Sequence, residues 1–354
     1  MPGGFAGLKK LSLLIRAPWG LGAALVFLLL VIGWLSLSLG YLEYSYQELG
    51  SILWAKLSGS EIGPRGQIIW ETRLPRMATA MAAGAALGLS GCVFQGLLLN
   101  PLADPYTLGV SSGAALGAAG AISLGLWGPA WLQNPLAATT GAMVGAVGAL
   151  LIVLALAREK TGHYPPTNLI LSGVILSAIL SAALSFLKYL AGDQVSSLVF
   201  WLLGSFLART WVDALLVGCF FCPALVVSLW SAVDLNVMTL GLGSARTLGV
   251  NVRGARARLL IVASLAAASA VAVSGVIGFV GLITPHLARL LVGPDHRALL
   301  PLSALSGAVL LSAADWVVRA VLPGEIPVGV LTAMLAGPVF LVIFRKKARQ
   351  LGDG

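Results

Sequence analysis

Long apolar runs, separated by short polar stretches, follow one another along almost the whole chain. A helix needs about 20 apolar residues to cross the hydrocarbon core of a bilayer. The pattern therefore predicts an all-α fold: a polytopic membrane bundle of about ten transmembrane helices, forming a single domain over residues 1–354. A shorter apolar piece, 194–207, predicts a helix along the membrane surface. The predicted spans are 19–40, 77–99, 108–127, 136–157, 168–190, 211–231, 257–275, 277–293, 299–320 and 327–344.

The composition supports lipid as the solvent for most of the surface. Hydrophobic residues make up 58% of the chain and charged residues only 10%, whereas ordinary soluble domains carry about 25% charged residues. The net charge of +9 would suit nucleic acid in a soluble protein, but here the charges cluster between apolar runs. Most Lys and Arg residues fall on the side that also holds both predicted termini, so this side is predicted to be cytoplasmic. We expect membrane lipid as a partner and no nucleic acid.

No catalytic or metal-binding motif accompanies the spans. The sequence contains neither GxxxxGK[ST] nor GxGxxG, and no H-E-x-x-H. Its three histidines are far apart, and the pair Cys219 and Cys222 has neither a second pair nor a histidine beside it. The sequence therefore predicts a chain that is not an enzyme and that holds no metal and no cofactor of its own.

Three arginines stand at the ends of predicted spans on the less basic side. Arg73 and Arg76 belong to an R-L-P-R motif before the second span, and Arg319 ends the ninth. Arginine suits bidentate pairing with carboxylates, which favours a docking site for an acidic extracellular partner. The alternatives are ordinary snorkelling to the interface for Arg73 and Arg76, and an i,i+4 pair between Asp315 and Arg319.

The segment 236–251 connects the sixth and seventh spans on the predicted cytoplasmic side. It is too short to cross the membrane, yet it carries Met238, Leu240, Leu242 and Leu248. An exposed apolar segment in this position favours a protein partner. The alternative is that the segment packs against the floor of the bundle.

Breaks in the predicted helices indicate transport. Asn100-Pro101 ends the second span at membrane depth, where irregular backbone is tolerated only beside a cavity or another helix, and this suggests a gate. It argues against a membrane scaffold without transport activity. A secondary transporter working alone typically carries ionisable residues at mid-membrane. The span centres hold almost none, and Gln95 is the nearest polar candidate.

The chain contains a long ordered set of motifs: RLPRMATAMAAGAALGLSG (73–91), NPLADPYTLGVSSGAALGA (100–118), LGSARTLGV (242–250), GVIGFVGLITPHLARLLVGPDHRALLP (275–301) and IPVGVLTAMLAGPVF (326–340). In these stretches, and in its span pattern, it resembles the FecCD-like permeases of type II ABC importers, which import cobalamin, haem and iron-siderophores. The resemblance implies a C2 dimer with a second copy, two ATPase subunits that carry ATP and Mg, and a periplasmic or lipid-anchored binding protein. It also implies the bacterial cytoplasmic membrane, with both termini inside.

The resemblance assigns roles at both ends of the bundle. Arg73, Arg76 and Arg319 match the arginines that receive glutamates from the two lobes of the binding protein. The segment of about 237–251 matches the coupling helices that insert into the ATPase. Its central residues are Leu242, Gly243, Ser244, Ala245 and Arg246.

The resemblance also implies a cytoplasmic gate and a substrate class. Asn100 and Leu102 match one side of the gate, and Pro166 and Thr167, at the start of the fifth span, match the other. Other members carry small polar residues where Pro165-Pro166 stiffens this chain. The expected substrate is an iron-siderophore, followed by haem and then cobalamin. A dimer is expected because one bundle offers no path wide enough for a bulky chelate.

Overall fold

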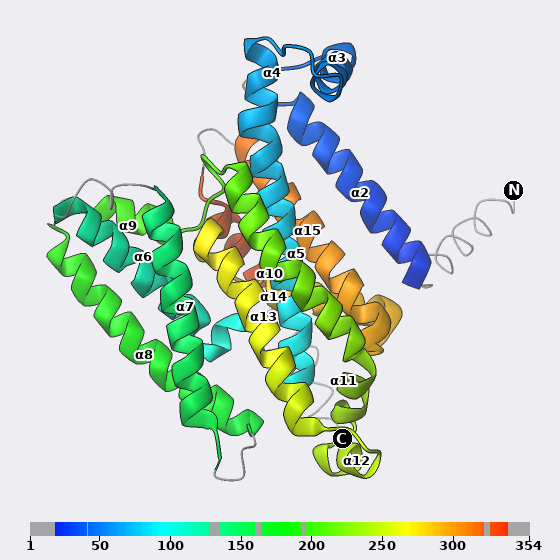
Figure 1. Ribbon diagram of the computed structural model, residues 1–354, viewed down its shortest axis with the longest axis vertical. Helices are drawn as coiled ribbons and strands as arrows, with labels where there is room; N and C mark the ends of the chain where they lie inside the picture. Colours follow the sequence, from blue (N-terminus) through cyan, green and yellow to red (C-terminus); the bar gives the residue numbers. More distant parts are fainter. Residues whose placement is uncertain are drawn as a thin grey trace, which may run out of the picture.

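The structure, a computed structural model, describes residues 18–40, 42–127, 135–159, 164–192, 195–321 and 326–338. All regular secondary structure in these ranges is helical, and the helices form a bundle (Figure 1). The fold class predicted from the sequence is confirmed. We call the end of the bundle that carries α3 and α4 the α3 end, and the opposite end the α12 end.

Seven helical stretches are long and apolar enough to cross a membrane, and three further apolar helices are shorter. Within the described residues, a helix therefore lies in each predicted span, although the eighth begins at Val280 rather than at residue 277; the remainder of the last span, 339–344, lies outside those residues. The long stretches are α2 (Pro18–Ser38), Pro64–Leu97, α7 (Pro135–Ala157), α8 (Pro166–Leu190), α10 (Trp211–Trp230), α13 (Val252–Ser274) and α15 (His296–Ala320). The shorter ones are α6 (Val110–Trp127), α14 (Val280–Val292) and Val328–Pro338.

The second long stretch begins well before its predicted start at residue 77. It joins α4 (Pro64–Ile68), a π-helical turn, η1 (Ile69–Arg73), and α5 (Leu74–Leu97). Helix α3 (Tyr46–Leu57) precedes it and was not predicted. Both additions carry charged residues, so a search for long apolar runs passes over them.

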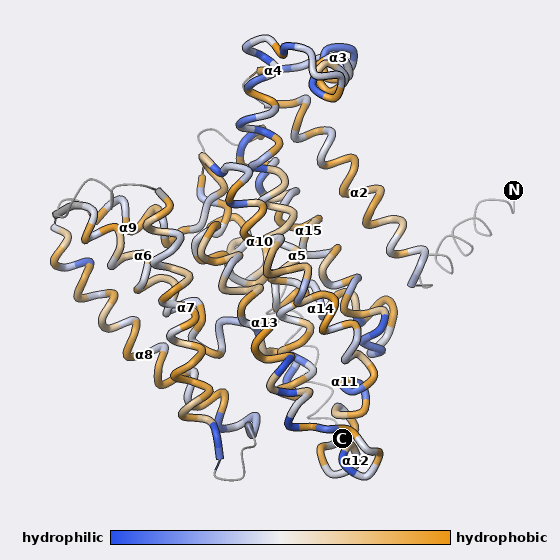
Figure 2. The backbone as a smooth tube through the Cα atoms, in the orientation of Figure 1, coloured by the Kyte–Doolittle hydropathy of each residue, from blue (hydrophilic) through white to orange (hydrophobic). Residues whose placement is uncertain are grey.

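The helices α5, α13 and α15 form the buried centre of the bundle, and they are far more buried than α2, α8 and α10. Helices α5 and α15 approach so closely that a Cβ atom at Gly84 would lie 2.2 Å from the carbonyl oxygen of Gly307. Small residues permit such contact, and packing rather than the hydrophobic effect holds helices together in lipid. Hydrophobic residues continue along the exposed helices, as lipid contact requires (Figure 2).

Helices α6, α7 and α8 stand beside this centre as a second group (Figure 1), and α7 contacts α13. Glycines again set the spacing. A Cβ atom at Gly117 would lie 2.0 Å from the carbonyl oxygen of Gly141, and one at Gly113 would lie 2.4 Å from that of Gly145.

Two helix breaks meet inside the bundle. The chain passes from α5 to α6 through the 3₁₀ turn η2 (Pro105–Leu108), and from α13 to α14 through residues 275–279. Gly275 and Phe279 both have positive φ angles, of 74° and 69°. The Tyr106 hydroxyl of η2 donates a hydrogen bond to the carbonyl of Ile277. One carbonyl of the irregular backbone thus finds its partner within the protein, as irregular backbone in a membrane protein requires.

Three short helices complete the described chain. Helix α9 (Val195–Leu202) occupies the stretch predicted to lie along the membrane surface; that location stays a prediction. Helices α11 (Ala232–Thr239) and α12 (Leu242–Thr247) follow α10 and form the connection to α13 at the α12 end (Figure 1).

Candidate functional site

The three arginines predicted to dock a binding protein gather at the α3 end. Arg73 closes the π-helical turn, Arg76 lies in the first turn of α5, and Arg319 lies in the last turn of α15. A Cβ atom at Gly40, just after α2, would lie 3.2 Å from Nη2 of Arg73 and 3.3 Å from Nη1 of Arg319. The two guanidinium groups therefore meet at the end of α2.

Arg73 and Arg319 both bind the C-terminal end of α2. Arg73 donates hydrogen bonds to the carbonyls of Leu37 and Leu42, and its guanidinium lies 4.8 Å from the centre of the Tyr44 ring. Arg319 donates to the carbonyl and the hydroxyl of Ser36. The last carbonyls of a helix have no partner within the helix and carry its negative dipole end, so the two cations cap α2.

Arg76 forms a buried ion pair with Asp315. Its Nε lies 3.0 and 3.1 Å from the two carboxylate oxygens, and its Nη2 lies 2.9 Å from Oδ1. Arg76 is 6% exposed and Asp315 2%. This pair joins α5 to α15 across 239 residues of sequence, a contact different from the pair within α15 that the sequence suggested.

The docking role of these arginines stays a prediction. In this conformation Arg73 and Arg76 are buried and Arg319 is half-buried, and each binds its own chain. Sequence analysis placed the three residues at one end, but it missed the α2 carbonyls, since backbone acceptors leave no signature in a motif.

The π-helical turn that carries Arg73 is fixed by an aromatic contact. The indole N–H of Trp211, the first residue of α10, donates to the carbonyl of Trp70 at 3.0 Å, and the two ring systems lie 5.6 Å apart. π-turns occur frequently at functional positions in proteins.

The predicted ATPase-coupling segment is partly anchored and partly exposed. Met238 in α11 and Ala245 in α12 are buried, while Leu240 is 73% and Leu248 66% exposed. The packing interpretation thus fits Met238 and Ala245, whereas the protein partner stays a prediction for the exposed leucines. Of the remaining predicted coupling residues, Leu242 is half-buried, and Gly243, Ser244 and Arg246 are exposed.

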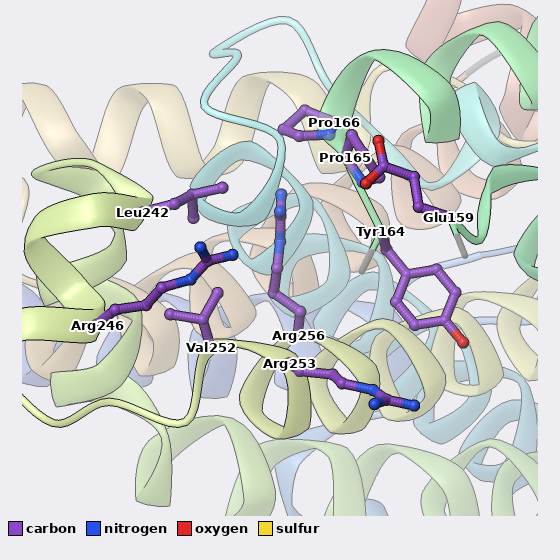
Figure 3. A pocket seen from close by; sticks show the side chains of 9 residues that line it. All are labelled: Glu159, Tyr164, Pro165, Pro166, Leu242, Arg246, Val252, Arg253 and Arg256. Carbon is purple, nitrogen blue, oxygen red and sulfur yellow. The ribbon is translucent and has the colours of Figure 1, made fainter. Parts of the chain in front are cut away.

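A pocket of about 160 Å³ separates this segment from the start of α8 (Figure 3). It brings the predicted gate residue Pro166 close to the coupling residues Leu242 and Arg246. Arg256, which also lines the pocket, donates to the Leu97 carbonyl at 2.6 Å and so caps the end of α5. The full lining is Glu159, Tyr164, Pro165, Pro166, Leu242, Arg246, Val252, Arg253 and Arg256.

Two of the other gate residues, Asn100 and Leu102, lie at the turn that follows α5. The Asn100 side-chain oxygen accepts a hydrogen bond from the backbone N–H of Leu102 at 3.0 Å, and Leu102 is 40% exposed. Asn100 lines a second pocket, of about 390 Å³, whereas Thr167 is exposed at the start of α8. Asn100 and Pro166 thus line different pockets, and the gate stays a prediction.

Gln95, the polar residue that the sequence placed nearest to a span centre, binds two residues of α14. Gln95 accepts from Nη1 of Arg289 at 2.9 Å and donates to the Leu282 carbonyl at 3.1 Å. In the described part of the chain, no cluster of three or more His, Cys, Asp or Glu residues could hold a metal ion.

Comparison with known proteins identifies the family. The FecCD transport family matches residues 28–346. The hemin transport system permease HmuU of Yersinia pestis is 40% identical over 334 residues, which cover 93% of this chain and 96% of the relative. The molybdate import permease MolB of Haemophilus influenzae is 39% identical, covering 92% and 95%.

A solved structure agrees with these relatives. It is described as a metal-chelate type ABC transporter in an inward-facing conformation, has a TM-score of 0.80 at 34% identity, and covers 92% of this chain and 99% of its own. Both the sequence and the helical architecture therefore place this chain in the FecCD transport family of ABC transporter permeases.

Proposed function

We propose that this ABC importer permease moves an iron-siderophore, or a similar bulky iron chelate, across the bacterial cytoplasmic membrane. The structural relative described as a metal-chelate transporter supports this substrate class. Haem is the first alternative, supported by the hemin permease of Yersinia pestis, and cobalamin is the second. The molybdate relative is almost equally similar to this chain, so the substrate must be decided by transport measurements.

The observation that carries the proposal is the coupling segment at the α12 end. The exposed side chains of Leu240 and Leu248 form apolar surface at the α12 end of the bundle. The buried residues Met238 and Ala245 anchor the same segment to the bundle. An anchored apolar surface suits a partner protein. We infer that this partner is the ATPase subunit, which binds ATP and Mg²⁺, because the permease itself carries no nucleotide-binding motif.

In the proposed mechanism two copies form a C2 dimer with the substrate path between them. Closure of the two ATPase subunits moves α12. Arg246 of α12 and Pro166 at the start of α8 line the same pocket, so a movement of α12 reaches α8 when this pocket closes. The permease switches between two conformations. The ATPase supplies the free energy that shifts the populations of these two conformations.

The binding protein, periplasmic or lipid-anchored, docks at the α3 end. Its glutamates must compete with the partners that the arginines already hold. Arg319 is the more accessible anchor because it is half-buried, whereas Arg76 is held by Asp315 in a buried pair. Docking at Arg73 and Arg319 would therefore exchange acceptor oxygens at the end of α2.

The proposal is tested by reconstituting the permease in proteoliposomes with its ATPase and binding protein. Uptake of a radioactive iron-siderophore, hemin and cobalamin is measured with ATP, with ADP and without the ATPase. We expect uptake of the iron-siderophore with ATP and the complete set only. Uptake without ATPase or nucleotide would make the chain a secondary transporter and overturn the proposal.

A paired variant tests the coupling surface. Replacing both leucines, Leu240→Ser with Leu248→Ser, should abolish ATPase association and uptake while leaving the unfolding temperature unchanged, because both side chains are exposed. Leu57→Ser is the matched control, since Leu57 is 80% exposed at the opposite end. Full association of the double variant would contradict the assignment of this surface.

A further inference from the structure

One side chain of the coupling segment is held by a different part of the bundle. The Asn236 side-chain oxygen, in α11, accepts from the backbone N–H of His296 at 2.9 Å and lies 2.7 Å from His296 Nδ1. The Asn236 amide nitrogen donates to the carboxylate of Asp295 at 2.8 Å. Both the oxygen and the nitrogen of the Asn236 side-chain amide thus bind the start of α15, about 60 residues further along the chain.

The receiving end of this contact is rigid. Asp295 caps α15 by accepting from the backbone N–H of Arg297 at 3.0 Å, and it also binds the Arg297 guanidinium, with a shortest distance of 2.7 Å. His296 is only 3% exposed. Asn236 therefore binds a preformed helix end rather than a loose loop.

His296 extends the contact to α5. A Cβ atom at Gly96 would lie 2.9 Å from His296 Nε2, so the imidazole packs directly against the α5 backbone. Gly96 lies four residues before Asn100, the residue assigned to the gate turn. His296 and Asn100 also line the same pocket of about 390 Å³. A path of direct contacts thus runs from α11 through His296 to the end of α5.

Leu235 of α11 also packs against α5, since a Cβ atom at Gly96 would lie 3.0 Å from Leu235 Cδ1, and this apolar contact reaches α5 without passing through α15. The polar link from α11 to α13 is weaker than the Asn236 contact. Asp234 and Arg258 of α13 lie 3.9 Å apart, and both are well exposed, so solvent screens the pair. It also connects the segment only to the helix that directly follows it. Asn236 instead reaches α15, which packs along α5 over much of its length.

We propose that Asn236 is a positioning residue that transmits motion of the coupling segment to α15 and, through His296 and Gly96, to the gate turn after α5. Packed helices move between discrete arrangements rather than deforming continuously, so a fixed link at their ends carries displacement. This role rests on the proposed function, since it presupposes an ATPase bound to α12.

The test measures substrate transported per ATP hydrolysed in the reconstituted complex. Asn236→Ala should keep ATPase association and hydrolysis but lower the ratio of transported substrate to hydrolysed ATP about fivefold or more. Losing a single hydrogen bond typically changes an equilibrium constant by about this factor. Asp234→Ala is the matched control. It removes the exposed pair between α11 and Arg258 of α13 and leaves the Asn236 contacts with α15 in place.

A charge-exchanged pair separates coupling from loss of structure. Asn236→Asp alone places two carboxylates together and should lower the ratio as Asn236→Ala does. Asn236→Asp combined with Asp295→Asn restores one donor opposite one acceptor, and it should recover most of the ratio. Failure of this rescue, or an unchanged ratio in Asn236→Ala, would overturn the proposal.

A second measurement needs no transport. Hydrogen exchange of the His296 amide, in the permease alone, should rise in Asn236→Ala and stay unchanged in Asp234→Ala. A wild-type complex without ATP-dependent uptake contradicts the proposed function. Unchanged exchange in Asn236→Ala contradicts the contact itself, so the two failures are distinguishable.

Discussion

At the residue scale, charged side chains at the α3 end hold helices together. Arg76 and Asp315 join two of the three central helices, α5 and α15, through a buried bidentate pair. Arg73 and Arg319 hold the end of α2. Any docking function of these arginines is therefore coupled to the packing of three helices.

Removing one member of the buried pair should be costly. Asp315→Ala leaves the Arg76 charge uncompensated, and we expect a loss of about 3–5 kcal/mol in the free energy of unfolding. Arg76→Ala combined with Asp315→Ala should lose less than the sum of the single variants, because it leaves neither charge alone. The measurement is thermal unfolding in detergent. Additive losses would contradict a direct pair.

The pH dependence of stability provides a second test at this scale. Burial raises the pKa of the Asp104 carboxyl from 3.8 to about 6, although the N–H groups of Tyr106 and Thr107 bind it and act in the opposite direction. Asp104 lies in the turn between α5 and α6. Between pH 4 and 6 the folded state binds more protons at this site than the unfolded state, so stability should fall as the pH rises through this window.

Asp104→Asn isolates this effect, because asparagine keeps the side-chain oxygen that caps η2 but does not ionise. The variant should unfold at a higher temperature than the wild type at pH 7.5, and the difference should shrink at pH 4.5. Asp104→Ala, which loses the cap, serves as the control. A wild-type advantage that grows with pH would contradict the raised pKa.

At this scale, the positions of candidate functional residues could be predicted from the sequence, but their contacts could not. Span counting was enough to place Arg73, Arg76 and Arg319 at one end. Their partners could not be predicted, because backbone carbonyls at the end of α2 become acceptors only after the helices pack. The contact between Asn236 and the start of α15 could not be predicted from the sequence either, since the two partners lie about 60 residues apart in the chain.

At the element scale, glycines decide how closely the helices approach. Gly84→Ala should destabilise the protein by about 1–3 kcal/mol, the usual cost of overpacking, because its Cβ would lie 2.2 Å from the Gly307 carbonyl oxygen. Gly120→Ala, in α6, meets nothing within 4 Å and should be neutral or stabilising. Equal unfolding temperatures for the two variants would contradict this packing.

The spans themselves could be predicted because a helix needs about 20 apolar residues to cross a bilayer, and runs of this length are visible in the sequence. The elements missed are those outside this rule. Helix α3 is short and partly charged, and its start depends on Ser45, whose side chain accepts from the backbone N–H of Glu48. The extension of α5 back to Pro64 crosses the charged residues Arg65 and Glu71, which lower the local hydropathy.

At the scale of the whole molecule, the chain belongs to the FecCD transport family of ABC transporter permeases, which work with an ATPase and a substrate-binding protein. Its family was recognisable from motifs because these encode local turns and contacts. A dimer interface could not be predicted from one chain, and neither could the substrate, since the proposed substrate path runs between two copies. The orientation in the membrane follows from charge bias alone and remains a prediction.

The most direct test of the central claim is the side of the membrane on which the coupling segment lies. In a background without Cys92, Cys219 and Cys222, Leu248→Cys is treated with a membrane-impermeant maleimide in right-side-out and inside-out vesicles. Leu57→Cys is the control from the opposite end. We predict labelling of Leu248→Cys in inside-out vesicles only, with protection when the ATPase is bound. Labelling from the outside, or no protection by the ATPase, would contradict the account.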